Sequence, residues 1–149
     1  MDSLLPYLNE ELIVSLDVAT REEAISSMVA LLANKGYLTD QTAFYQAVLD
    51  REKLVSTGIG MGVALPHAKL SDYDDFFITI AILKHGINWD AQDGAPVRLV
   101  FMIGGPDDKQ TLYLQILSRL TYALKDEARR KKMLQFTSSR DIIALFEKF

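Results

Sequence analysis

Residues 51–69, "REKLVSTGIGMGVALPHAK", combine one histidine, two hydroxyl side chains, three glycines and an arginine. The imidazole of His67 can act as a neutral nucleophile near pH 7, because its ordinary pKa is about 6.5. Pro66 has a fixed φ and favours an extended residue before it, which predicts that His67 projects from a stiff strand or strand end. Arg51 carries a permanent charge on a planar fork that suits phosphate oxygens. These residue types favour a site that handles a phosphoryl group on a histidine.

The residues between Arg51 and His67 supply further candidate donors. Ser56 and Thr57 offer hydroxyls, while Gly58 and Gly60 permit tight turns and close approach of an anion to the backbone. Backbone amides in such a loop can point together at an anion. We therefore predict phosphate-supporting contacts from these four residues. Taken without other information, an ordinary histidine beside a glycine-rich turn explains the same pattern equally well.

Other chemistries fit the sequence poorly. No Gly-Lys-Ser/Thr ending follows the glycines, and Val63 stands where a dinucleotide fingerprint requires glycine. His67 with the loop carboxylates of residues 72–75 is a poor ligand set for zinc or iron, so no metal and no cofactor is predicted. The motifs of serine hydrolases are absent from the sequence. His85 is predicted to be a surface residue in a turn and Trp89 a packing anchor, and residues 129–132 ("RRKK") are predicted to form an exposed helical face.

The composition indicates one globular domain that spans residues 1–149. A net charge of −4 and a pI of about 5.1 argue against partners such as nucleic acid or anionic membrane. The most apolar segment, "FFITIAIL", is far shorter than the roughly 20 residues of a membrane helix, which predicts no direct membrane insertion. The acidic start does not resemble a secretory signal. We therefore expect a cytoplasmic protein.

Hydrophobic periodicity predicts strands that alternate with helices. Residues 76–84 and 97–103 are two continuous apolar runs. Both are rich in β-branched residues, as in strands that are buried on both faces. Alternation of this kind favours an α/β fold, a single-domain α/β sandwich with a central mixed β-sheet flanked by helices. The predicted strands are 12–16, 76–84 and 97–103. The predicted helices are 20–35, 39–53, one that starts after 106, 127–136 and 138–149. In the first of these helices Thr20 and Glu23 form a capping box and Gly36 follows the end, and the helix after 106 has Asp107 or Asp108 as its cap.

Residues 51–69 closely resemble the active-site region of phosphotransferase system (PTS) enzyme IIA domains of the fructose and mannitol class. The nitrogen-regulatory members are especially similar through "REK" and "STGIG". The resemblance extends to "SMVALLANKGYLTD", "INWDAQDGAPVRLVFMIGGPDDK" and "LQILSRLTYALKDE", and so covers nearly the whole chain. It implies a phosphotransferase component without a cofactor, built on an α/β sandwich.

The resemblance also implies partners and residue roles. A small histidine-containing phosphocarrier protein would donate the phosphoryl group to the residue that matches the active histidine, His67. The group would then pass to a cysteine of a IIB domain and on to a sugar, or its presence would control binding to a regulatory target protein. By position, Arg51 matches the arginine that supports the phosphoryl group, and Ser56, Thr57 and Gly58 match the donors of the loop.

One position departs from the family pattern. Members commonly carry a second histidine early in the helix after the last central strand, and Tyr113 occupies the matching position. A tyrosine can donate a hydrogen bond to phosphate, but it is not a cation near neutral pH. This difference favours a regulatory role, and it leaves open a non-catalytic regulatory binding module with a vestigial phosphorylation site. The sequence indicates neither a sugar, nor an oligomeric state, nor a downstream partner.

Overall fold

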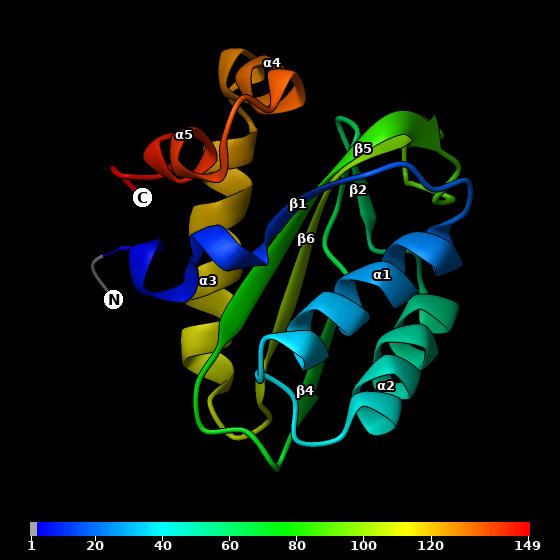
Figure 1. Cartoon of the computed structure of the whole chain (residues 1–149), viewed down its shortest axis with the longest axis vertical. Coiled ribbons are helices and arrows are strands. Elements are labelled where there is room, and N and C mark those ends of the chain that lie inside the picture. The colour runs from blue at the N-terminus through cyan, green and yellow to red at the C-terminus, as the bar shows by residue number, and fades with distance from the viewer. Residues whose placement is uncertain (1–2) are drawn as a thin grey trace.

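A six-stranded mixed sheet forms the centre of the molecule (Figure 1). The structure is a computed structural model and describes residues 3–149. Its strands are β1 (Ile13–Leu16), β2 (Gly58–Gly60), β3 (Val63–Ala64), β4 (His67–Leu70), β5 (Phe77–Ile87) and β6 (Val97–Pro106). The order is β1-β5-β6-β3-β2, and β4 also pairs with β6. The central strands β5 and β6 are antiparallel, while β1, β3 and β4 each run parallel to the central strand beside them.

Helices cover both faces of this sheet (Figure 1). α1 (Arg21–Asn34) and α2 (Gln41–Leu54) pack on one face. α3 (Gln110–Leu124) packs on the other face, together with α4 (Glu127–Gln135) and α5 (Ser139–Ala144). The predicted α/β sandwich with a central mixed sheet flanked by helices is therefore confirmed.

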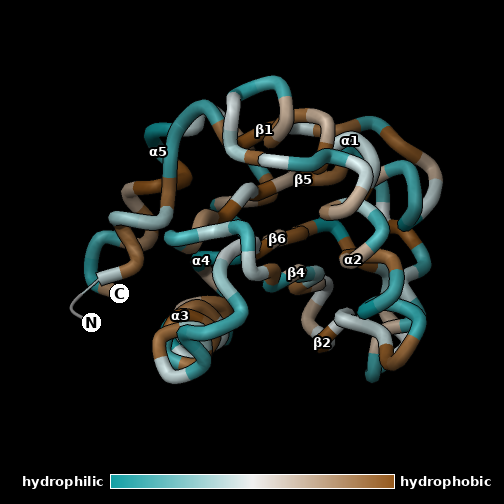
Figure 2. Tube along the Cα trace, turned by 90° about the horizontal axis from the view of Figure 1, so that it is seen from below, coloured by the Kyte–Doolittle hydropathy of each residue, from teal (hydrophilic) through white to brown (hydrophobic). Residues whose placement is uncertain are grey.

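The central strands are hydrophobic on both sides because each side meets a layer of helices. Successive strand residues point to opposite faces, so a strand between two cores requires a continuous apolar run. Along β6, Phe101 lies in the core on the α3 side, whereas Val100 and Met102 lie in the core on the α1 and α2 side. Figure 2 shows β6 as a hydrophobic segment in the middle of the molecule. The prediction of two strands buried on both faces is confirmed.

The ends of α1 follow its predicted signals. The Thr20 hydroxyl accepts a hydrogen bond from the Glu23 amide at 3.1 Å, and the Glu23 carboxylate accepts one from the Ala19 amide at 3.1 Å. At the other end Gly36 has a φ of 83°, the left-handed conformation that ends many helices. The Thr20 cap and the glycine stop are confirmed, whereas Glu23 bonds the amide of Ala19 instead of the Thr20 amide that a capping box uses.

β6 is longer than predicted, because it continues through Gly104 and Gly105 to Pro106. A Cβ atom on Gly104 would lie 2.4 Å from the ring of Phe77, and one on Gly105 would lie 2.2 Å from the ring of Phe76. Glycine thus makes room for two aromatic side chains inside a paired strand, since β4 pairs with this part of β6. The predicted end of this strand at residue 103 was wrong.

Two other boundaries differ from prediction. β5 extends to Ile87, which is buried and pairs with Val97, so the exposed His85 lies in a strand and not in a turn. α3 has Lys109 as its N-cap without a side-chain hydrogen bond, and the predicted aspartate cap is wrong. Since β6 ends at Pro106 and α3 begins at Gln110, Asp107 and Asp108 lie in the connection between the strand and the helix.

Candidate active site

His67 is the first residue of β4 and lines a cavity of about 190 Å³. The structure brings Arg51, Ser56, Thr57 and Tyr113 to the same cavity. The rest of the lining is supplied by Val55, Ile59, Leu65, Gln92 and Leu117. Five of the predicted site residues therefore lie around one cavity. Gly58 and Gly60 are not among the lining residues.

The strand β4 fixes where the imidazole points. β3 and β4 run one after the other along β6, separated by Leu65 and Pro66, and the Pro66 carbonyl accepts a hydrogen bond from the amide of Ile103 at 3.0 Å. Ala68 is buried on one face of β4, so His67 and Lys69 point to the opposite face. The prediction that the histidine projects from a strand end is confirmed.

The protonation of His67 follows from its surroundings. Its Nδ1 lies 3.2 Å from the carbonyl oxygen of Leu65. A carbonyl only accepts hydrogen bonds, so Nδ1 carries the hydrogen and Nε2 keeps a free lone pair. Burial lowers the pKa of His67 below its ordinary value and the positive charges of Arg51 and Lys69 lower it further, while the Leu65 hydrogen bond and the negative charge of Glu52 oppose them. The imidazole is therefore neutral at pH 7, with its lone pair on Nε2.

Arg51 supplies the positive charge of the cavity from the last turn of α2. Its Nη1 donates to the carbonyl of Val55 at 2.8 Å, immediately beyond the helix. Cations at a helix C-terminus satisfy free carbonyls and are favoured by the helix dipole. The same contact holds the guanidinium group beside the cavity.

A buried carboxylate, which the sequence analysis did not identify, organises the loop after α2. Glu52 is 5% exposed and accepts hydrogen bonds from the amide and the hydroxyl of Thr57, both at 2.6 Å. The indole of Trp89 donates to the same carboxylate at 3.2 Å. Trp89 is fully buried, as predicted. The available signal for Glu52 was its position four residues after the buried Val48, on the inward face of α2.

The polar groups of this loop are bonded to one another. The Ser56 hydroxyl donates to the carbonyl of Trp89 at 2.5 Å and accepts from the Gly58 amide at 3.1 Å. The donors of Thr57 are engaged by Glu52. Contacts from Ser56, Thr57 and Gly58 to a phosphoryl group therefore stay a prediction, and they require exchange of these internal bonds.

The glycines of the segment shape the β2–β3 turn. Gly60 has a φ of 96° and lies against the Asp93 carboxylate. A Cβ atom on Gly58 would lie 2.7 Å from that of Ala91, so only glycine allows this approach. Any support of a phosphate by the Gly60 amide is likewise still a prediction.

Tyr113 packs beside the His67 ring, and Lys69 packs on Tyr113. The Tyr113 ring centroid lies 5.4 Å from that of His67, and burial raises the pKa of Tyr113 to about 12, so its hydroxyl is neutral. The Lys69 ammonium lies 4.1 Å from the Tyr113 ring centroid and donates to Gln110 Oε1 at 2.5 Å. Lys69 was not among the predicted site residues, although its spacing of two from His67 on a strand places both side chains on one face.

Comparison with known proteins identifies the family. The profile described as "Phosphoenolpyruvate-dependent sugar phosphotransferase system, EIIA 2" matches residues 6–149. The chain belongs to this EIIA family. It is a component of the phosphotransferase type, and a phosphoryl-accepting carrier role fits both its sugar-specific and its nitrogen-regulatory relatives.

Relatives of this EIIA chain fall into both groups. It is 37% identical to the fructose-specific EIIABC component of Bacillus subtilis over 87% of the chain, although the match spans only 20% of that protein. The fructose-specific EIIA component of Haloferax volcanii is 36% identical, over 83% of the chain and 80% of the relative. The nitrogen regulatory protein of Bradyrhizobium diazoefficiens is 34% identical, over 92% of the chain and 87% of the relative.

Solved structures give the same division. The nitrogen regulatory protein IIA-Ntr of Neisseria meningitidis superposes with a TM-score of 0.89 at 25% identity, over 95% of the EIIA chain and 97% of that structure. The IIA mannitol structure of Escherichia coli has a TM-score of 0.78 at 29% identity, over 93% of the EIIA chain and 97% of that structure.

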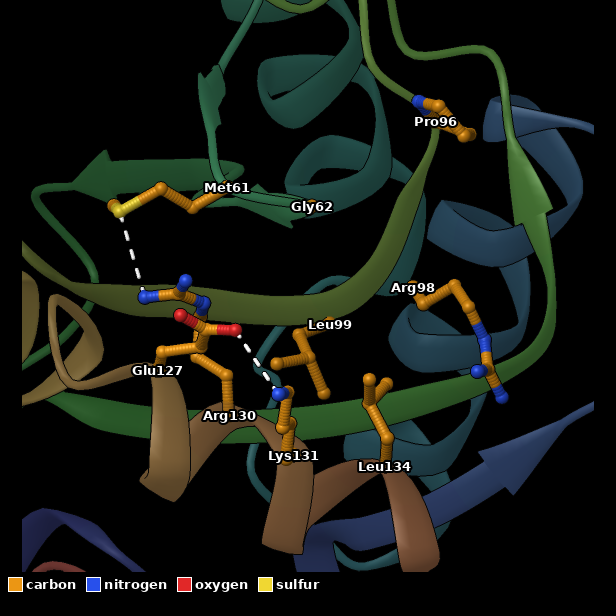
Figure 3. A pocket seen from close by; sticks show the side chains of 9 residues that line it. All are labelled: Met61, Gly62, Pro96, Arg98, Leu99, Glu127, Arg130, Lys131 and Leu134. Carbon is orange, nitrogen blue, oxygen red and sulfur yellow. Dashed lines mark hydrogen bonds and ion pairs between the residues drawn. The ribbon is translucent and has the colours of Figure 1, made fainter.

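A second cavity of the EIIA chain, of about 260 Å³, lies between the β2–β3 turn and α4 (Figure 3). Its charged side chains are bonded internally. Arg130 donates to the main-chain carbonyls of Leu124 and Lys125, and Lys131 pairs with Glu127 at 3.0 Å. Arg129 likewise donates to main-chain carbonyls, of residues 123 and 145. The prediction that residues 129–132 form an exposed face is therefore wrong for both arginines, which connect α4 to its neighbours.

Two features are absent from residues 3–149 of the EIIA chain. In this part of the chain no cluster of three or more His, Cys, Asp or Glu side chains could hold a metal ion. Across the same residues, no helix has the length and apolar character needed to cross a membrane.

Proposed function

We propose that Nε2 of His67 accepts a phosphoryl group from the phosphohistidine of a small histidine-containing phosphocarrier protein. The Nε2 lone pair forms the new N–P bond, the N–P bond of the donor breaks, and its electron pair returns to the donor imidazole. No proton transfer accompanies the step when the donor ring is protonated on its second nitrogen, because the donor then leaves as a neutral imidazole while His67 keeps its hydrogen on Nδ1. The hydrogen bond between Nδ1 and the Leu65 carbonyl carries this proposal, since it leaves Nε2 free to react.

Charge stabilisation comes from the protein alone. Phosphoryl transfer depends mainly on positioning and on stabilising the charge of the equatorial oxygens. The Arg51 guanidinium beside the cavity serves this purpose, and Ser56, Thr57, Gly58 and Gly60 are the candidate supporting donors. Neither a metal ion nor a nucleotide has a part in this step.

Exposed apolar side chains near the cavity fit a docking rim for the donor. Leu54 is 77% exposed, Val55 62% and Leu114 52%. Val55 also lines the cavity, and Leu114 follows Tyr113 on α3. Exposed apolar residues that gather around a polar site are typical of protein interfaces. A phosphoryl group adds roughly −1.5 to −2 charge at the centre of this rim, so the same event can change which partner docks.

The phosphoryl group then has two possible uses. Transfer to the cysteine of a IIB domain is supported by the complex of IIA mannitol with phosphorylated IIB mannitol from Escherichia coli, which superposes with a TM-score of 0.79 at 28% identity. Use as a regulatory switch is supported by the likeness to IIA-Ntr and by Tyr113 at the position of the usual second histidine.

Incubation with phosphoenolpyruvate, enzyme I and the phosphocarrier protein tests the proposal by intact mass. We expect one acid-labile phosphoryl group, which His67→Ala abolishes and the matched change His85→Ala retains. An adduct that survives His67→Ala but not His85→Ala would move the site to the other histidine. If active partners give no adduct on the wild type, the chain is a binding module with a vestigial site.

Addition of a IIB domain separates the two uses of the group. Rapid loss of the adduct to the IIB cysteine indicates a transport component. An adduct that persists in the presence of active IIB domains indicates a regulatory switch.

A further inference from the structure

Lys69 and His67 project from the same face of β4. Residues two apart on a strand share a face, and the residue between them, Ala68, is buried on the other side. The charge of Lys69 acts on the imidazole, because it contributes to lowering the pKa of His67. The two side chains also share a neighbour, since the Tyr113 ring contacts both.

The phosphoryl site is short of positive charge. Among the described residues that line the cavity, Arg51 is the one permanent cation. A phosphoryl group brings roughly −1.5 to −2 charge at pH 7, so a single guanidinium leaves it about half neutralised. Partly buried charge without a partner is costly, and a second cation within reach would remove that cost.

Lys69 is placed to provide that cation. Its ammonium group is held by Gln110 Oε1 at 2.5 Å and by the face of the Tyr113 ring at 4.1 Å. The amide oxygen of Gln110 is a neutral acceptor on an exposed side chain, whereas a phosphoryl oxygen is charged and forms a stronger hydrogen bond. The flexible four-carbon stem of lysine allows the exchange without a backbone movement.

We propose that Lys69 is the second cation of the phosphoryl site and leaves Gln110 for a phosphoryl oxygen when Nε2 of His67 carries the group. The Tyr113 ring holds the ammonium beside the imidazole in both states through a cation–π contact. The inference rests on the proposed function of His67. It assigns to Lys69 a contact with the transferred group itself, and to Gln110 the part of a competing acceptor.

The transfer equilibrium with the phosphocarrier protein measures this contact. In Lys69→Met the apolar stem stays on the Tyr113 ring and the charge is lost. We therefore expect the equilibrium constant for phosphorylation to fall by about tenfold, as for loss of one charge-assisted hydrogen bond. Lys69→Arg retains the cation and restores most of the loss. The matched control is Lys109→Met, since the Lys109 ammonium is held by the Asp74 carbonyl, whereas that of Lys69 lies on the Tyr113 ring beside His67.

Removal of the competitor gives a second, opposite readout. Gln110→Ala removes the hydrogen-bond acceptor of the ammonium group and leaves the attraction of the Asp107 carboxylate, so we expect the equilibrium to shift severalfold toward phosphorylated protein. A role of Lys69 in packing alone would predict no such gain. Circular dichroism and the urea midpoint check that each variant is folded.

Each outcome decides a different statement. A wild-type protein that takes up no phosphoryl group overturns the function of His67 and this inference together. A wild type that is phosphorylated, with the same equilibrium constant in Lys69→Met and Lys109→Met, leaves His67 as the acceptor and overturns the assignment of Lys69. A Gln110→Ala variant that loses phosphorylation would also contradict the exchange.

Discussion

The carboxylate of Glu52 holds Thr57 by two atoms at once, accepting hydrogen bonds from its amide and its hydroxyl at 2.6 Å each. The Trp89 indole donates to the same carboxylate and to the Thr57 hydroxyl, both at 3.2 Å. Glu52 directly follows Arg51 in α2. One buried carboxylate therefore fixes both the end of the helix that presents the guanidinium and the loop that walls the cavity.

We predict that Glu52→Gln lowers the free energy of unfolding by about 2 kcal/mol, because an amide turns its NH₂ group toward at least one of the Thr57 and Trp89 donors and leaves it unpaired. Urea unfolding measures the change. Glu147→Gln, at an exposed position, is the matched control and should stay within about 0.5 kcal/mol of wild type. Equal stability of the two variants would show that the Glu52 network contributes little.

Replacement of Arg51 should affect transfer far more than folding. Removal of one well-placed hydrogen-bond donor to the reacting group typically lowers the rate by about 10²–10³. We expect that loss for Arg51→Ala in single-turnover transfer from the phosphocarrier protein. Arg51→Lys should recover part of the rate, because it keeps the charge without the planar fork. Arg140→Ala removes an exposed arginine that pairs with Glu10, and it should transfer normally. Comparable rates in the two alanine variants would argue against a role for Arg51 in transfer.

The pKa of His67 should make stability depend on pH. Burial lowers this pKa in the folded protein, so between that value and about 6.5 the unfolded chain binds a proton that the folded chain does not. Stability therefore rises with pH through this window and is constant with respect to His67 above it. Urea midpoints from about pH 7.5 down to about pH 5 should fall less steeply for His67→Asn than for wild type. Identical slopes would mean that the folded and unfolded states share one pKa at this position.

Much of the fold and half of the site could be predicted from local sequence. Short stretches of sequence are enough to predict the Thr20 cap and the buried strands β5 and β6. One such stretch, residues 51–69, contains both Arg51 and His67. Glu52 and Lys69 escaped because their partners are distant in sequence: Trp89 lies 37 residues from Glu52, and Gln110 lies 41 residues from Lys69. Local spacing indicates which face each side chain occupies, but their roles depend on these tertiary contacts.

The glycines at the end of β6 show why that boundary was misjudged, and they give a test by packing. A Cβ atom on Gly105 would lie 2.2 Å from the Phe76 ring, which is buried in the core on the α3 side. We predict that Gly105→Ala costs about 1–3 kcal/mol of unfolding free energy, as overpacking does. In a Phe76→Leu background, which removes the ring atoms that clash, the same alanine should cost less by about 1 kcal/mol or more. A double-mutant cycle from urea unfolding measures this coupling, and a coupling energy near zero would show that strand geometry, not the Phe76 ring, requires glycine at this position.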